Sequence, residues 1–346
     1  MRDTRSEVDE ALSAAGARRG PDGALRFSTA AKEAEAMERE PVAAPLEDDR
    51  VIHVAGGDAH RFLQAQLPTD VPPPGSDRAL LAACCTVTGR VVAVFELAAR
   101  SSGYLLRLPA SAARGLIERL ARYRLRSRVE FLDRGWHAFG VAGPGAAGAL
   151  EAVLGAVPDP GRCAETEEEA VVARSFGGGA RFTLFVPSGR FRRICDTLLG
   201  HLQPVGPETF RLAELREGLP WIHEETAGQF VPQMLGLERM GAVSFSKGCY
   251  PGQEVVARTQ HLGTVKRVLV RAALDAGGEV PRPGTTLFSG DGRPAGHVLY
   301  AARAAAGIEA LAVVARDLAG GPWRAGEPDG PSLRLTGRPR PDPGEG

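Results

Sequence analysis

The stretch Lys247-Gly248-Cys249-Tyr250-Pro251-Gly252-Gln253-Glu254 lies late in a chain of 346 residues and predicts a tight loop that leads into a helix. Gly248 and Gly252 allow close backbone turns, and Pro251 suits a position near the start of a helix. Glu254 lies in the first predicted turn with Arg258 four residues later, the order that favours an ion pair along a helix.

The loop places Cys249 just before a helix N-terminus, two residues after Lys247. The helix N-terminus and Lys247 both favour the thiolate over the thiol, because each offers positive charge to the sulfur. A thiolate in such a loop suits a nucleophile or a metal ligand. The alternative is a small buried apolar residue in a tight turn, and the residue types alone leave it open.

The composition narrows the class of protein. The chain has 42 basic and 42 acidic residues, so long-range attraction to nucleic acid is not expected; we expect neither direct DNA binding nor tRNA contact, although a local basic patch stays open. No apolar run is long enough for a membrane span and no N-terminal signal is visible, so we expect a cytoplasmic protein. The five cysteines include no CxxC pair, which argues against a disulfide framework or a zinc site.

Apolar periodicity and turn residues divide the chain into five parts. We expect a disordered tail over residues 1–23, a first α+β lobe over 24–130, and a second α+β lobe with the motif over 131–263. Short strands between Gly/Pro turns predict a β-barrel over 264–331, and the Pro/Gly/Arg-rich end predicts a second disordered tail over 332–346.

The two lobes repeat a strand, helix, hairpin and helix. The predicted elements are a helix at 28–40, a strand at 51–55, a helix from 58, a hairpin at 79–97, a strand at 104–108 and a helix at 111–123; then a strand at 136–141, a helix at 143–154, a polar loop at 158–169, a hairpin at 170–186 and helices at 188–199 and 210–218; and barrel strands at 268–273, 285–289, 296–302 and 311–315.

Residues 244–254 resemble the signature of the YgfZ family, whose core is Lys-Gly-Cys-Tyr-x-Gly-Gln-Glu. Residues 228–233 and 256–267 resemble the flanking family segments, and 57–67 and 85–90 match more weakly. Members of this family bind folate, are required for the activity of iron–sulfur enzymes and are also described as tRNA-modifying proteins. The family is related to the glycine-cleavage T-protein (GcvT), an aminomethyltransferase. The resemblance implies the same properties for this chain.

The resemblance implies an α+β, GcvT-like fold in which two related lobes and a C-terminal β-barrel surround a central folate cavity. It implies tetrahydrofolate as cofactor, iron–sulfur client or assembly proteins as partners, and a transient cluster as an open alternative; no resident metal is expected. Cys249 is then the reactive group, and Lys247 holds its thiolate. The expected folate-binding residues are Gln229, Gln233, Tyr250, Gln253, Glu254, Arg258, Lys266 and Arg267.

Departures from the family pattern bear on activity. After Gly89-Arg90 the hairpin reads Val91-Val92-Ala93-Val94, where T-proteins carry an Asp pair that includes their catalytic acid. This argues against aminomethyl transfer, since the hairpin offers only Glu96. Pro251, Gly236 and Met234 also depart from the usual family residues. We therefore predict an accessory protein for iron–sulfur cluster assembly or repair that supports tRNA modification indirectly; the alternative is a folate-dependent aminomethyltransferase or other one-carbon transferase.

Overall fold

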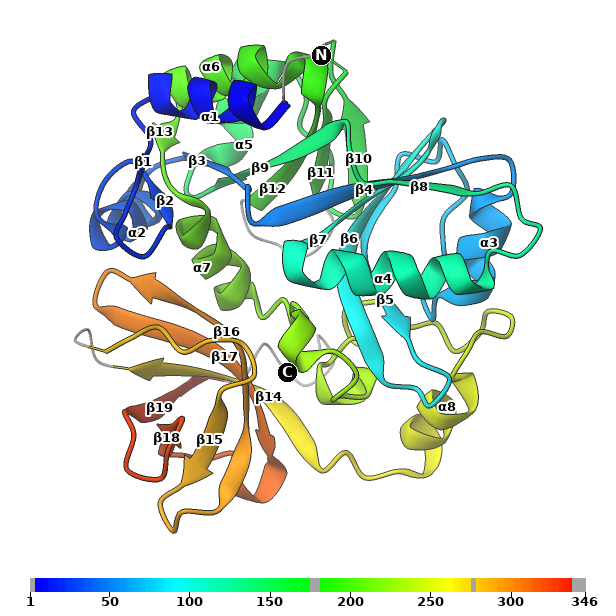
Figure 1. Cartoon of the computed structure of the whole chain (residues 1–346), viewed down its shortest axis with the longest axis vertical. Helices are drawn as coiled ribbons and strands as arrows, with labels where there is room; N and C mark the ends of the chain where they lie inside the picture. Colours follow the sequence, from blue (N-terminus) through cyan, green and yellow to red (C-terminus); the bar gives the residue numbers. More distant parts are fainter. Residues whose placement is uncertain (1–3, 168, 175–180, 275–277, 338–346) are drawn as a thin grey trace.

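The computed structural model describes residues 4–167, 169–174, 181–274 and 278–337, and the side chains of Thr4, Arg5, His261 and Leu262 are not part of that description. Two α+β lobes and a closed six-stranded β-barrel meet around helix α7 (Pro207–Glu217) (Figure 1). The predicted α+β class, the paired lobes and the barrel are confirmed. Among the described residues, no helix has both the length and the apolarity to cross a membrane.

The first lobe is an antiparallel sheet with strand order β5-β6-β7-β4-β8 and two helices on one face. Phe62 and Leu116 from the two helices pack with Phe95 and Leu106 from the sheet, which explains why each helix carries one apolar face. The elements are β4 (Asp49–Ala55), α3 (Ala59–Gln66), β5 (Ala79–Cys85), β6 (Val91–Arg100), β7 (Gly103–Pro109), α4 (Ala110–Tyr123) and β8 (Glu130–Leu132).

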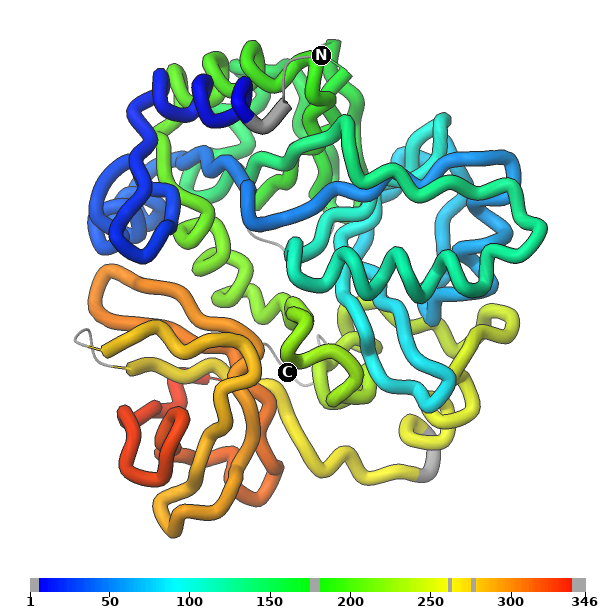
Figure 2. The backbone as a smooth tube through the Cα atoms, viewed as in Figure 1, coloured from blue at the N-terminus to red at the C-terminus, as the bar shows by residue number. Residues whose placement is uncertain are grey.

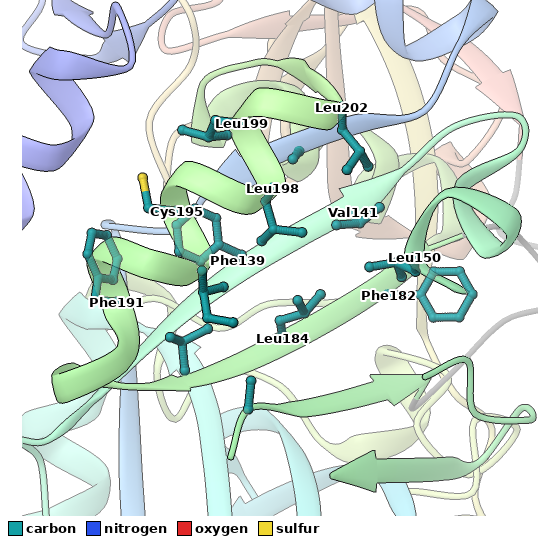
Figure 3. Packing of buried hydrophobic residues seen from close by; sticks show 14 of the residues in the cluster. Phe139, Val141, Leu150, Phe182, Leu184, Phe191, Cys195, Leu198, Leu199 and Leu202 are labelled. Atoms are coloured by element: carbon teal, nitrogen blue, oxygen red, sulfur yellow. The ribbon is translucent and has the colours of Figure 1, made fainter. Parts of the chain in front are cut away.

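The second lobe is a sheet of order β10-β11-β12-β9-β3-β13, in which β3 and β13 pair in parallel. Figure 3 shows Phe139, Leu184 and Leu198 within its core, where helices cover one face. The elements are β3 (Val42–Pro45), β9 (Trp136–Ala142), α5 (Ala146–Leu154), β10 (Arg162–Glu165), β11 (Val171–Arg174), β12 (Arg181–Pro187), the short 3-10 helix η1 (Ser188–Arg190), α6 (Phe191–His201) and β13 (Gln203–Pro204).

The predicted boundary between the lobes is wrong. Strand β3 precedes the first lobe in the sequence but pairs with β9, so residues 24–45 belong to the second lobe. Residues 158–169, expected to be a loop, contain β10. The chain therefore starts in the second lobe, builds the first, and returns, as the blue-to-green path in Figure 2 shows.

Residues 4–23 are ordered, contrary to the predicted tail over 1–23, and residues 1–3 lie outside the described residues. The N-terminal part of the chain forms α1 (Thr4–Ala14), a two-stranded sheet of β1 (Arg18–Arg19) and β2 (Leu25–Arg26), and then α2 (Ala30–Arg39). Ala11 and Leu12 are buried against the core of the second lobe, and Arg19 donates to both oxygens of Glu47 at 2.7 and 2.8 Å. Packing onto the lobe, which the weak periodicity does not reveal, stabilises this helix.

The barrel closes in the order β14-β17-β16-β15-β18-β19. Val270, Val298, Val314 and Trp323 fill its interior. The predicted tail over 332–346 is wrong for residues 332–337, which form the closing strand; 338–346 lie outside the described residues. The elements are β14 (Arg267–Leu274), β15 (Thr286–Ser289), β16 (Pro294–Ala304), β17 (Gly307–Ala315), η4 (Arg316–Leu318), β18 (Trp323–Ala325) and β19 (Ser332–Gly337).

Helix α7 (Pro207–Glu217) and residues 218–263 connect the second lobe to the barrel. This connection carries η2 (Glu224–Thr226), η3 (Pro232–Met234) and α8 (Gln253–Leu262). Trp221 and Phe230 from the connection form one buried cluster with Val91 of the first lobe and Leu311 of the barrel. The motif was expected in the second lobe, but its segment packs on the first lobe instead.

Candidate functional site

The motif loop lies on the tip of the β5–β6 hairpin. Gly252 has φ 87°, and a Cβ there would lie 2.4 Å from the Thr86 carbonyl oxygen and 2.8 Å from the Gly89 nitrogen. A Cβ on Gly89, at φ 71°, would lie 3.0 Å from the Val255 Cβ. Only glycine fits at such positive φ angles and short separations, so the predicted need for Gly252 is confirmed. Helix α8 starts at Gln253, two residues after Pro251.

Lys247 fastens the loop to the end of α3. Its ammonium donates to the carbonyls of Leu67 at 2.9 Å and Thr69 at 2.6 Å and to the Gln64 side-chain oxygen at 3.2 Å. A cation suits these carbonyls because they lie at a helix C-terminus. Burial lowers the pKa of Lys247 to about 8, which the charge of Asp70 partly opposes. The expectation that Lys247 holds the Cys249 thiolate is therefore wrong: it positions the loop instead.

Cys249 is exposed, whereas the other four cysteines are buried, and all five lie within the described residues. Burial raises the pKa of Cys84 to about 11 and that of Cys195 to about 12, so those thiols stay protonated at neutral pH. The buried-cysteine alternative for Cys249 is thus wrong. The loop presents one accessible sulfur at the surface on a backbone held from both sides.

Three of the predicted folate-binding residues hold the segment in place. The side-chain amide of Gln229 donates to the Glu225 backbone carbonyl at 2.7 Å. The backbone carbonyl of Gln229 accepts a hydrogen bond from the Arg90 guanidinium at 2.7 Å. Gln233 is buried and donates to the Val256 carbonyl at 2.8 Å. The Tyr250 ring is buried with its hydroxyl unpaired among the described residues, and burial raises its pKa to about 12. Gln233 thus joins η3 to α8, and Gln229 joins the connection to the β5–β6 hairpin.

The remaining predicted residues lie elsewhere on the connection. Gln253 is half-buried at the start of α8, Arg267 is half-buried at the start of β14, and Glu254, Arg258 and Lys266 are exposed. No ion pair joins Glu254 to Arg258 in the described structure, so that predicted pair is wrong. Gln233 and Tyr250 are buried whereas Glu254, Arg258 and Lys266 face solvent, so the eight residues do not line one common pocket. The side chain of His261, which lies near Cys249 in the sequence, is outside the described side chains.

Sequence reasoning missed a buried ion-pair cluster at the junction of the two lobes with α7. Arg107, fully buried, contacts Asp49 and Glu214 and donates to Glu96 at 2.8 Å. Arg181 bridges Glu96 at 3.1 Å and Glu217 at 2.9 Å. Arg211 contacts both Asp49 and Glu214. We call Asp49, Glu96, Arg107, Arg181, Arg211, Glu214 and Glu217 the junction cluster. It lies where the resemblance predicts a central cavity.

Aromatic rings flank the junction cluster and leave polar atoms unpaired. The Arg107 guanidinium lies 4.8 Å from the Trp221 ring centroid, and that of Arg211 lies 5.6 Å from it. Arg181 Nη2, Trp221 Nε1 and His223 Nε2 are buried with no hydrogen-bond partner among the described residues. Burial, with a contribution from Arg211, lowers the pKa of His223 to about 4, so this ring is neutral at neutral pH. A planar polar ligand with acceptor atoms fits the chemistry of these donors.

A pocket of about 610 Å³ opens elsewhere, between α1, the β3–β4 connection and the start of β9. It reaches Asp49 of the junction cluster and is lined by Glu47, Trp136 and His137, but by no residue of the motif. His137 and Ser188 share a hydrogen bond of 3.1 Å at its wall.

Fold and site together define the class. The chain is similar over 95% of its length, and over 96% of that chain, to the crystal structure of glycine cleavage system aminomethyltransferase T from Bartonella henselae, with a TM-score of 0.76 and 19% sequence identity. The protein thus has the GcvT-like fold, with an exposed thiol on a loop outside the junction. No protein-family model matches the chain.

Relatives narrow the class to a family. The chain is 31% identical over 225 residues to tRNA-modifying protein YgfZ of Klebsiella pneumoniae (strain 342), which covers 65% of this chain and 69% of that one. It is 29% identical, with the same coverage, to tRNA-modifying protein YgfZ of Colwellia psychrerythraea (strain 34H / ATCC BAA-681). The chain belongs to the YgfZ family, and the resemblance read from residues 244–254 is confirmed.

Proposed function

We propose that this protein acts in the cytoplasm as a tetrahydrofolate-binding accessory factor for the assembly or repair of iron–sulfur clusters, and that it supports tRNA modification through an iron–sulfur enzyme. The observation that carries the proposal is the exposure of Cys249 on a loop that Lys247 and Gly252 hold rigidly. A positioned, accessible thiol suits transient contact with a cluster or with a thiol of a partner protein.

In this proposal the reduced folate would bind at the junction cluster. Arg181 Nη2 and Trp221 Nε1 are buried donors without partners, and a pterin offers ring nitrogens and a carbonyl as acceptors. When bound, a reduced folate supplies one-carbon chemistry. The residues of this chain would bind and orient it and keep water from it. The half-buried His223, neutral at neutral pH, adds a third polar contact.

Transfer of an aminomethyl group receives less support. The carboxylate of Glu96, the acid that the hairpin offers, accepts hydrogen bonds from Arg107 at 2.8 Å, Arg181 at 3.1 Å and Thr183 at 2.7 Å. A carboxylate with three donors is a poor proton acceptor, because each bond favours its charged form. Binding without turnover is therefore the better-supported role.

The thiol is tested in cells that lack the protein. Cys249→Ser should abolish recovery of an iron–sulfur enzyme and of the tRNA modification that depends on it, while Cys163→Ser should leave both intact because that sulfur is buried. Unchanged recovery with Cys249→Ser, at equal protein level, would refute the role of the thiol.

Folate binding is tested with purified protein. Tetrahydrofolate should quench tryptophan fluorescence and raise the melting temperature, since a ligand that binds the folded state stabilises it. Trp221→Phe should lose the quenching, whereas Trp323→Phe should keep it, because Trp323 lies inside the barrel. Equal quenching in both variants would place the ligand away from the junction.

A further inference from the structure

The surface around Cys249 carries exposed apolar side chains. Val87 is 62% exposed, Phe245 39% and Val255 40%. These are three of the six large apolar side chains exposed among the described residues; the others are Leu125, Leu132 and Leu335. A single exposed apolar residue is ordinary, but a group of them marks an interaction site.

The three side chains lie on segments that contact each other. Val87 is at the hairpin tip, where the Thr86 carbonyl meets Gly252 of the motif loop and Gly89 meets Val255 of α8. Phe245 is in the same loop, which the Ser244 amide fastens to the Pro68 carbonyl at 2.9 Å. Figures 1 and 2 both show the hairpin tip beside α8 and away from the barrel. We call Val87, Phe245, Cys249 and Val255 the hairpin–helix surface.

Charged side chains border this surface with an excess of positive charge. Arg90 follows the hairpin tip and Arg258 lies one turn along α8; both are exposed. Glu254 is the exposed acid in the same stretch of α8. The whole chain is neutral, so the excess is local. An acidic partner complements it, since interfaces match potentials of opposite sign.

We propose that the hairpin–helix surface docks a protein partner that presents an apolar anchor within an acidic rim and brings its own cysteine or cluster iron to Cys249. This inference rests on the proposed function and names the contact that the thiol uses. Val87 and Val255 are aliphatic, which favours a protein partner over RNA. Proteins that bind single-stranded RNA without sequence preference stack the bases on aromatic side chains and hold the phosphates in a continuous basic groove. Glu254 interrupts such a groove.

The test compares surface variants with the thiol variant in the same cells. Val87→Asp/Val255→Asp should reduce recovery of the iron–sulfur enzyme by about tenfold or more, the loss expected when apolar anchors are replaced by charges. Leu125→Asp is the matched control, because Leu125 is 88% exposed and lies after α4, outside this surface. The rate of Cys249 alkylation and the melting temperature should be the same in the parent protein, in Val87→Asp/Val255→Asp and in Leu125→Asp.

A second variant keeps the test valid if the double substitution disturbs folding. Arg258→Glu reverses an exposed charge beside Val255 on α8 and should also reduce recovery. If both surface variants are active while Cys249→Ser is inactive, the docking surface is wrong and the proposed function stands. If Cys249→Ser is active as well, the proposed function itself fails.

Measurements on the purified protein distinguish two other molecules that could cover the hairpin–helix surface, a second copy of the chain and RNA. Light scattering that shows a dimer in the parent and a monomer in Val87→Asp/Val255→Asp would mean that a second copy covers the surface, which overturns the proposal. Salt-dependent tRNA binding that the same variant abolishes would assign the surface to RNA, and this result also overturns it.

Discussion

Replacing Arg107 with methionine tests the junction cluster directly. The guanidinium is fully buried and contacts three carboxylates, those of Asp49, Glu96 and Glu214. Methionine keeps the apolar stem of the side chain but is shorter and removes the guanidinium with its charge. The substitution therefore removes the ion pairs of Arg107 together with the contact of its guanidinium with the Trp221 ring, while the packing of the stem is kept.

The expected loss in the free energy of unfolding depends on the hydrogen-bond donors that the three carboxylates keep in the variant. Removal of one partner from a buried ion pair costs about 3–5 kcal/mol, because a charge is left buried and under-compensated. In this variant Glu96 keeps Arg181 and Thr183, while Asp49 and Glu214 keep Arg211. Each carboxylate retains a donor, so we expect a loss near the lower end, about 3 kcal/mol at pH 7.

The assay is urea unfolding of the parent and variant at pH 7 and pH 5, with the free energy of unfolding extrapolated to zero urea. The variant buries two more negative than positive charges, so one carboxyl should take up a proton and the difference should shrink at pH 5. Arg114→Met is the control: its pair with Glu118 is exposed, and we expect no measurable change. A difference below about 1 kcal/mol at pH 7 would refute the assigned role of the cluster.

Three further results are expected. Gly252→Ala should destabilise the protein by about 2 kcal/mol through its positive φ and the close Thr86 carbonyl, whereas Gly248→Ala, which has open space, should not; equal unfolding curves would contradict this. His223→Gln should flatten the fall in stability between pH 6.5 and pH 4, since the pKa near 4 means that the unfolded state binds the extra proton in that window; an unchanged slope argues against it. Tyr250→Phe removes a hydroxyl that is buried and unpaired among the described residues, so urea unfolding should show no loss of stability; a clear loss would reveal a missing partner.

Local features of the motif could be predicted from the sequence. The turn at Gly252 and the helix after it follow from residue types within a few positions, whereas the exposure of the Cys249 sulfur did not. The partners of Lys247 could not, because the oxygens that it contacts belong to residues 64–69, far earlier in the chain. A lysine two residues before a cysteine indicates a thiolate partner, yet the tertiary fold directs this ammonium to a helix end.

The junction cluster was hidden for a related reason. Glu96 and Arg107 each occur singly within an apolar strand, and a single charge in a strand gives no sign of whether it faces solvent or a partner. Their pairing depends on β6 and β7 being neighbours and on α7 crossing them. Strand and helix positions were predictable from periodicity, whereas the path of the chain through both lobes was not, because strand β3 finds its sheet only through long-range pairing.

The position of β3 has a consequence for the order in which the protein is made. During synthesis, residues 42–45 leave the ribosome before the first lobe, but their partner strand β9 starts only at Trp136, and β13 comes later still. The first lobe, contiguous over residues 49–132, can fold as soon as it emerges, while the apolar strand Val42–Pro45 waits unpaired. Nascent chains of this protein thus expose a sheet edge that chaperones would have to shield until the second lobe is complete.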